Sequence, residues 1–144
     1  MVRLYRFIKR WFVFPAVWGD VLGVDEKGWL AEKQAAQFLQ KQGLSLLTHR
    51  FRVKQGEVDL IMQEGAVLVF VEVRFRAAGG VGASKESIGY AKQRKIIYAA
   101  HRYLQKNKLK QSAVCRFDVV AMSGCLTHPE IEWVKNAFVC RQAI

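Results

Sequence analysis

Two apolar segments joined by a short polar turn, at residues 56–76, constrain the fold of this 144-residue chain more than any other stretch. Both segments alternate with period two, which is typical of β-strands. The turn falls at residues 63–66, where Gly65 can adopt a positive φ. In an antiparallel hairpin with an even-length loop, opposite residues have numbers that sum to an odd value. This register places Asp59 on the same face as Phe70 and Glu72.

Three acidic side chains, Glu57, Asp59 and Glu72, therefore gather on a hairpin that is otherwise strongly apolar. Burying such charges costs free energy unless they are paired or bind a cation. Mg²⁺ is held by one or two carboxylates, keeps several waters, and can then activate water toward a phosphodiester. The alternative is a solvated Glu57–Asp59 face, with Glu72 paired to Arg74 or to a neighbouring residue. The second strand argues against that alternative, because apolar side chains occupy both of its faces: Val67, Val69, Val71, Val73 and Phe75 on one, Leu68 and Phe70 on the other.

Three short motifs resemble the YraN-like proteins, a bacterial family placed among the restriction-endonuclease-like nucleases with the PD-(D/E)xK motif. They are GEVDLI at 56–61, VFVEVR at 69–74 and KQ at 92–93. The resemblance covers residues 28–138 and leaves out the N-terminal segment. It implies a restriction-endonuclease-like core and a nuclease that acts on DNA.

The resemblance also implies roles for individual residues. Asp59 and Glu72 match the acidic residues of the motif and would be ligands of Mg²⁺ or Mn²⁺. Arg74 stands where the wider superfamily has Lys, although the family tolerates both. Glu32, on the preceding helix, matches the extra acidic residue of resolvase-like members. Because a guanidinium does not shuttle protons, Arg74 would act as a fixed positive charge.

A net charge of +11 and a pI near 9.9 favour an anionic partner, such as nucleic acid or a membrane surface. Three cysteines at spacings that fit neither a zinc site nor a set of disulfides are typical of a reducing cytoplasm. A single domain of this length can bury a sizeable core. The composition predicts a cytoplasmic protein with an anionic partner, and the resemblance implies that this partner is DNA, with RNA as the other possibility.

Residues 1–24 differ from the rest of the chain, so we expect an N-terminal extension before a domain at 25–144. The extension is basic, aromatic and apolar, and its apolar run of eight residues, 11–18, is too short to span a bilayer. It fits either an amphipathic segment on a membrane surface or an extension packed on the domain. The amphipathic pattern sets Arg3, Arg6, Lys9 and Arg10 against Leu4, Phe7, Ile8 and Trp11.

Two helices are predicted around the hairpin. The first covers residues 25–42, with Asp25 as N-cap, and places Glu32 at the border of its apolar stripe. The second runs from Ser84 to about Lys106 and is strongly basic. On its apolar stripe, Gln93 would either face the carboxylates or cap a backbone group. Nucleic-acid phosphates would be bound by Arg76, Lys92, Arg94 and Lys95.

Further strands are predicted at 44–53, 113–122 and 131–134, with Ser123 and Gly124 in a turn and Arg116 paired with Asp118. The resulting order of helix, three strands, helix and strand gives an α/β domain with a mixed central sheet. Together with the resemblance, this predicts a Mg²⁺- or Mn²⁺-dependent endonuclease with catalytic residues Glu32, Asp59, Glu72, Arg74 and Gln93. A nucleic-acid-binding protein that keeps the fold without the chemistry is the alternative. The sequence leaves the oligomeric state and the preferred substrate open.

Overall fold

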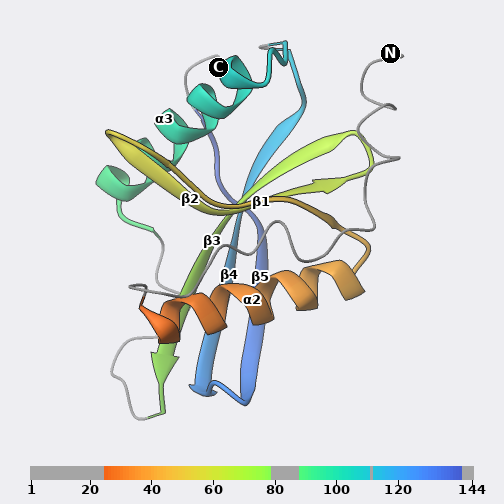
Figure 1. Ribbon diagram of the computed structural model, residues 1–144. Coiled ribbons are helices and arrows are strands. Elements are labelled where there is room, and N and C mark those ends of the chain that lie inside the picture. Colours follow the sequence, from red (N-terminus) through yellow and green to blue (C-terminus); the bar gives the residue numbers. More distant parts are fainter. Residues whose placement is uncertain (1–24, 79–87, 111, 141–144) are drawn as a thin grey trace.

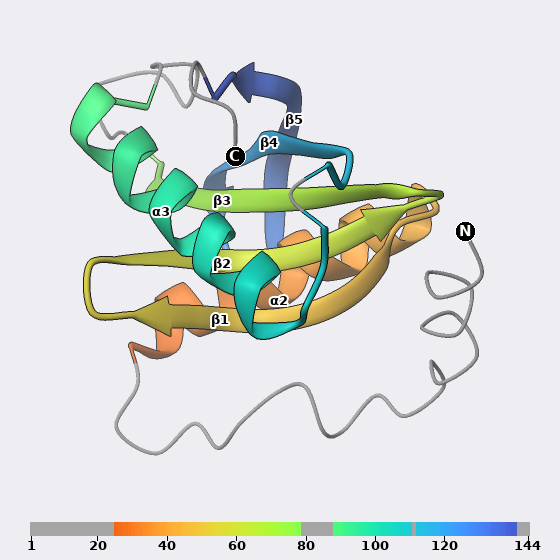
Figure 2. The same ribbon diagram turned by 90° about the horizontal axis from the view of Figure 1, so that it is seen from above.

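The structure is a computed structural model that describes residues 25–78, 88–110 and 112–140. Five strands form one mixed sheet, and two helices cover its opposite faces, so the α/β class predicted from the sequence is confirmed (Figures 1 and 2). The elements are α2 (Glu26–Lys41), β1 (Ser45–Val53), β2 (Gly56–Glu64), β3 (Val67–Ala77), α3 (Tyr90–Lys106), β4 (Cys115–Cys125) and β5 (His128–Phe138).

The strands lie in the sheet in the same order as in the chain, from β1 to β5. All neighbours are antiparallel except β3 and β4, which are parallel and are connected through α3. In the hairpin, Glu64 pairs with Val67 and Leu60 with Val71. Gly65 takes a φ of 58° in the two-residue turn. The predicted hairpin and its odd-sum register are therefore confirmed.

Two hydrophobic cores fill the space between the sheet and the helices. The core under α3 includes Ile61 and Phe70, and the core under α2 includes Leu60 and Val71. Since consecutive strand residues point to opposite faces, β2 and β3 contribute to both cores. This double burial explains why β3 carries apolar residues at nearly every position.

Gly56 allows α3 to approach the beginning of β2 very closely. A Cβ atom at this position would lie 2.1 Å from the carbonyl oxygen of Lys95, a distance that no packed structure tolerates. Only glycine therefore fits here, and the reason is steric rather than conformational. The contact positions the N-terminal half of α3 over the strand that carries Asp59.

Three predicted boundaries were wrong. The helix α3 begins at Tyr90, after Gly89 in an extended conformation (ψ 148°), whereas Ser84 lies outside the described residues. Ser123 and Gly124 belong to β4, where Gly124 takes a φ of 90°, and the turn instead comprises residues 126–127. The strand β5 extends well beyond the predicted 131–134, because an edge strand exposes polar side chains that interrupt the apolar pattern.

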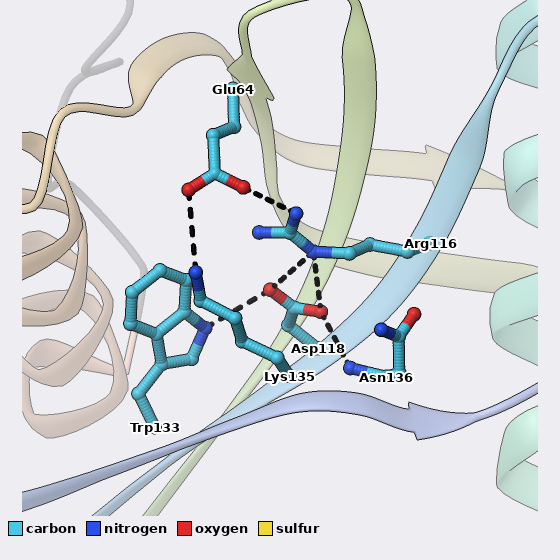
Figure 3. Close-up of polar contacts among 6 residues, drawn as sticks. All are labelled: Glu64, Arg116, Asp118, Trp133, Lys135 and Asn136. Atoms are coloured by element: carbon cyan, nitrogen blue, oxygen red, sulfur yellow. Dashed lines mark hydrogen bonds and ion pairs between the residues drawn. The ribbon is translucent and has the colours of Figure 1, made fainter.

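A buried polar network joins β4 and β5 (Figure 3). Asp118 is fully buried and accepts hydrogen bonds from Arg116 Nε at 3.1 Å, from Trp133 Nε1 at 3.0 Å and from the Asn136 backbone N–H at 3.0 Å. Arg116 also contacts Glu64 on β2. The predicted pair of Arg116 and Asp118 is confirmed, and it fixes three strands at one end of the sheet.

The predicted N-terminal extension, 1–24, lies outside the described residues, as does most of the glycine-rich segment that precedes α3. Neither α2 nor α3 is long and apolar enough to cross a bilayer, and they are the helices of the described chain. Cys115, Cys125 and Cys140 are free thiols.

Candidate active site

The candidate site begins where β2 and β3 stop pairing. Regular pairing of these strands ends at Leu60 and Val71, and the next two residues along the same register are Asp59 and Glu72. In place of a backbone partner on β2, the N–H of Val73 donates a 2.8 Å hydrogen bond to Asp59 Oδ2. The strands therefore separate at the point where their two carboxylates lie, and the Asp59 side chain bridges the gap.

Both carboxyl groups have pKa values above their ordinary range. For Asp59, burial is the main cause, the charge of Glu72 adds to it, and the hydrogen bond from Val73 offsets only part, so the pKa lies well above 3.8. For Glu72, burial raises the pKa more than the neighbouring Lys92 lowers it. Glu72 Oε2 is buried with no hydrogen-bond partner among the described residues. The raised pKa values thus come mainly from burial, which disfavours the charged form of both carboxyl groups.

Lys92, on the first turn of α3, supplies positive charge to this pair. Its Nζ lies 3.4 Å from Glu72 Oε1 and 3.7 Å from Glu57 Oε1. Burial lowers the pKa of Lys92, but the charges of Glu72, Asp59 and Glu57 outweigh that effect and leave it above the ordinary value. Lys92 was predicted to bind nucleic-acid phosphates, and the structure places it within the carboxylate site itself.

Glu57 connects this site to the neighbouring strand. Its carboxylate also lies 3.3 Å from Arg52 Nε on β1. An unbroken series of ion pairs therefore runs from Arg52 through Glu57 and Lys92 to Glu72. Glu57 is 46% exposed whereas Glu72 is 12% exposed, so the series leads from solvent to the buried carboxylates.

Glu32 is buried on the sheet-facing side of α2, rather than at the border of the apolar stripe as predicted. Arg50 binds it through Nε at 2.6 Å and Nη2 at 3.1 Å, and His49 Nε2 lies 2.5 Å from Oε2. Burial raises the pKa of Glu32, but His49 and Arg50 together lower it by more than burial raises it, so the pKa lies below its ordinary value. Glu32 therefore carries a firmly held negative charge, and that charge contributes to the raised pKa of Asp59.

Two residues of β1, His49 and Arg50, were not predicted to belong to the site. The side chain of His49 is only 5% exposed and lies against Glu32. Arg50 takes a φ of 50°, which is uncommon for a residue other than glycine. In addition to Glu32, the charges of Asp59 and Asp25 raise its pKa. The register irregularity of β1 lies further back, between Leu46 and Thr48, and no pattern in the sequence identifies the conformation of Arg50.

The other predicted site residues lie on β3 and α3. Arg74 lies two residues beyond Glu72 on β3 and is partly buried, and Arg76 lies two residues further. Gln93 donates a 2.7 Å hydrogen bond from Nε2 to the Ile88 carbonyl, which is the backbone-capping alternative. The side chains of Arg94 and Lys95 are exposed on α3.

The carboxylates of the site suit a cation that needs few protein ligands, such as Mg²⁺ or Mn²⁺, better than Zn²⁺. No group of three or more His, Cys, Asp or Glu side chains is close enough to hold a metal within residues 25–78, 88–110 and 112–140. A site for Zn²⁺ built wholly from side chains is therefore absent from this part of the chain. Mg²⁺ or Mn²⁺ requires only one or two carboxylates, and the unpartnered Glu72 Oε2 beside Asp59 provides them.

Comparison with known proteins identifies relatives over most of the chain. The model of "Uncharacterised protein family UPF0102" matches residues 31–122, which include Glu32, Asp59, Glu72 and Lys92. A UPF0102 protein of Alkalilimnicola ehrlichii is 48% identical over 113 residues, covering 78% of this chain and 86% of the relative. A UPF0102 protein of Colwellia psychrerythraea is 43% identical over 114 residues, covering 78% of this chain and 88% of the relative.

A third relative extends further toward the N-terminus. The UPF0102 protein HEAR0176 of Herminiimonas arsenicoxydans is 46% identical over 136 residues, covering 94% of this chain and 98% of the relative. A match of that extent must include part of residues 1–24. The N-terminal segment is therefore shared with at least this relative, although the resemblance described from the sequence excluded it.

Proposed function

The chain belongs to the uncharacterised protein family UPF0102, and we propose that this member is a metal-dependent phosphodiesterase that cleaves DNA. The observation that carries the proposal is the pair of buried carboxylates, Asp59 and Glu72, at the point where β2 and β3 separate. Their pKa values are raised mainly by burial, and Glu72 Oε2 has no hydrogen-bond partner among the described residues, so the site holds carboxylate oxygens that are costly to bury. Perturbed carboxylates of this kind are concentrated at functional sites.

In this proposal Asp59 and Glu72 hold one Mg²⁺ or Mn²⁺. The bound cation supplies Lewis-acid charge to the phosphoryl oxygens of the substrate. The hydrogen bond from Val73 fixes the Asp59 carboxylate, so it needs little reorganisation to bind the ion. Glu32, held by Arg50 and His49, assists by adding fixed negative charge next to Asp59 without leaving its own partners.

Two cations are available to stabilise the charge that develops on the scissile phosphate. Lys92 keeps its proton at neutral pH, because its pKa is raised by Glu72, Asp59 and Glu57. It therefore acts as a charge rather than as a base. Arg74 supplies a guanidinium from β3, two residues beyond Glu72. Preorganised charges at a partly buried site contribute more than the same charges in water.

The fold and the basic surface support the same proposal. The chain order of a helix, three antiparallel strands, a second helix and a fourth strand parallel to the third is compatible with the restriction-endonuclease-like core that the resemblance implies. Arg76, Arg94 and Lys95 would neutralise phosphates of the substrate on either side of the site. Gln93 would stabilise the N-terminus of α3 through its hydrogen bond to the Ile88 carbonyl.

One observation favours a second candidate function, nucleic-acid binding without cleavage. Lys92 already pairs with Glu72, and Glu32 is fully engaged by Arg50 and His49, so much of the negative charge is compensated by the protein itself. Isothermal titration with Mn²⁺ separates the two functions. We expect binding by the wild-type protein and none by Asp59→Ala. An absence of Mn²⁺ binding at millimolar concentration, or binding untouched by Asp59→Ala, would leave the non-catalytic function.

A second experiment identifies the substrate by measuring cleavage in the presence of Mn²⁺. Its substrates are linear duplex DNA, a flap, a junction, single-stranded DNA and RNA. The same substrates with Asp59→Asn are the matched control, because this change removes the charge and keeps the shape. Cleavage of any substrate by the wild-type protein alone supports the enzyme. Equal cleavage by both proteins would indicate a contaminating nuclease.

Residues 1–24 carry a separate proposal, contact with a membrane surface. Replacing Arg3, Arg6, Lys9 and Arg10 by glutamine in the full chain should abolish co-sedimentation with anionic liposomes and leave neutral liposomes unaffected. Co-sedimentation that does not change would remove this proposal. The nuclease proposal does not depend on the outcome.

A further inference from the structure

We propose that the outer face of α3 binds a single strand of nucleic acid, with bases stacked on Tyr90 and Tyr98 and phosphates bound in a basic hollow at the end of the helix. This inference rests on the proposed function for the nature of the partner and adds the substrate class. It would make the protein selective for DNA with an unpaired segment, such as a flap, an overhang or a gap.

The first support is a pair of exposed aromatic side chains. Tyr90 is 74% exposed and Tyr98 is 38% exposed, although aromatic residues are usually buried. They lie eight residues apart, which is two helical turns and about 12 Å along the axis. That spacing places them on the same side of α3, far enough apart to hold two different bases. The face of a nucleobase stacks on an aromatic ring without regard to its identity.

Positive charge accompanies these rings along the same face. Arg94 lies between the two tyrosines in the helical stripe, with its guanidinium 5.9 Å from the centre of the Tyr90 ring. Arg102 continues the stripe one turn beyond Tyr98. The sequence of α3 contains five Lys and Arg residues and no Asp or Glu. A helix face of alternating rings and cations complements a polyanion that presents bases.

The third support is the basic hollow, which lies between the C-terminal half of α3 and the end of β1. Its volume is about 390 Å³. The lining residues are Phe51, Arg52, Val53, Arg102, Gln105 and Lys106, three of them cations and none acidic. Lys106 Nζ lies 5.8 Å from the centre of the Phe51 ring, so its charge is held at this place. Several converging cations suit a phosphate of the nucleic-acid backbone.

The hollow and the carboxylate site are physically connected. Arg52, which lines the hollow, is the first member of the series of ion pairs that continues through Glu57 and Lys92 to Glu72. Arg102 belongs both to the hollow and to the outer stripe of α3. A strand that follows the stripe therefore reaches the hollow at one end, and at the other end it reaches Tyr90, two residues before Lys92 in the chain.

Fluorescence anisotropy of the full chain with EDTA, which prevents cleavage, tests the inference on a labelled oligothymidylate and on a duplex of equal length. The double variant Tyr90→Ala and Tyr98→Ala should bind the single strand at least tenfold more weakly, and the duplex with little change. The double variant with Phe at both positions, which keeps the rings, should retain the affinity of the wild type. Equal losses on both ligands, or no loss on the single strand, would overturn the stacking surface.

The hollow is tested by the salt dependence of the same binding. Each phosphate contact on a single strand contributes about 0.7 to the slope of log affinity against log salt. Replacing Arg102 and Lys106 by glutamine should therefore reduce that slope by about 1.4. Replacing Lys27 and Lys33 on α2 by glutamine is the matched control and should leave it unchanged. An unchanged slope in the α3 variant would exclude the hollow as a phosphate site.

These measurements fail separately from the proposed function. If no metal binds and no DNA is cleaved, tyrosine-dependent binding of the single strand still supports this inference. If duplex DNA is cleaved and replacing the tyrosines does not change single-strand binding, this inference is wrong while the proposed phosphodiesterase function still stands. Thermal melting of each variant, expected within a few degrees of the wild type for exposed positions, confirms that the fold is intact.

Discussion

The Oδ2 atom of Asp59 accepts a 2.8 Å hydrogen bond from the backbone N–H of Val73, the residue next to Glu72 on β3. One carboxylate of the candidate site is therefore fixed by the strand that carries the other. Burial raises the pKa of both groups, and the charge of Glu72 adds to the rise at Asp59. Under the proposed function, a bound cation would offset the cost of burying these carboxylates.

Replacing Asp59 by Asn should stabilise the metal-free protein at neutral pH. Because the folded pKa of Asp59 is raised above its unfolded value, the native state binds more protons in the window between the two values. The free energy of unfolding therefore falls as pH rises through that window, and Asn removes this loss. We expect the melting temperature to rise by about 3 °C or more at neutral pH, with little change in acid.

The same variant should lose any stabilisation by Mn²⁺, which thermal melting with and without the ion will show. Glu130→Gln, at an exposed carboxylate on β5, is the matched control and should change neither property. A lower melting temperature for Asp59→Asn at neutral pH would mean that the aspartate charge stabilises the fold.

Arg74 should act through charge alone. Arg74→Lys keeps a cation at this position and should retain or increase metal-dependent cleavage, whereas Arg74→Met should abolish it with the fold intact. The measurement is single-turnover cleavage together with thermal melting. Unchanged cleavage with a lower melting temperature for Arg74→Met would identify Arg74 as a structural partner.

Lys92→Met should reduce cleavage by about 10²- to 10³-fold, the range typical of losing one electrostatic donor at an active site. The change also removes the cation nearest to Glu72, so the pKa of that carboxyl group should rise further and shift the pH profile of cleavage upward. Lys95→Met is the matched control, since its exposed side chain lies one turn along the same helix. Equal effects of the two changes would show that Lys92 serves only general phosphate attraction.

Gly56→Ala should destabilise the protein by about 2–4 kcal/mol, because the new Cβ would lie 2.1 Å from the Lys95 carbonyl oxygen and must displace α3. Chemical denaturation measures the loss. Gly89→Ala is the control, because no atom lies within 4 Å of a Cβ built there. Its effect should stay below about 1 kcal/mol. Similar losses for both variants would contradict the steric explanation.

Asp118→Ala should cost about 3–5 kcal/mol, since it leaves the Arg116 guanidinium, the Trp133 indole and the Asn136 N–H without their buried acceptor. Lys135→Ala removes a half-exposed partner of Glu64 in the same network and should cost less than about 1 kcal/mol. Urea denaturation distinguishes them. A small effect of Asp118→Ala would mean that water replaces the aspartate.

The sequence predicted the hairpin well and its surroundings less well. Period-two alternation fixes both the register and the face of each strand residue, so the proximity of Asp59 and Glu72 could be predicted from their numbers alone. The orientation of Lys92 toward the carboxylates could not be predicted, because it depends on how α3 packs on the sheet. That packing includes the close contact between Gly56 and Lys95. The roles of His49 and Arg50 depend on how Glu32 of α2 packs against β1 and on the positive φ of Arg50, and neither leaves a pattern in the sequence.

The parallel pairing of β3 with β4 has a consequence for the order in which the molecule is built. Leu68 and Cys115 are neighbours in the sheet but are separated along the chain by the whole of α3. The hairpin of β2 and β3 closes a two-residue turn and can form within microseconds, whereas the parallel pair must wait for the helix. From this topology we expect Lys92 to join Asp59 and Glu72 only after the hairpin has formed.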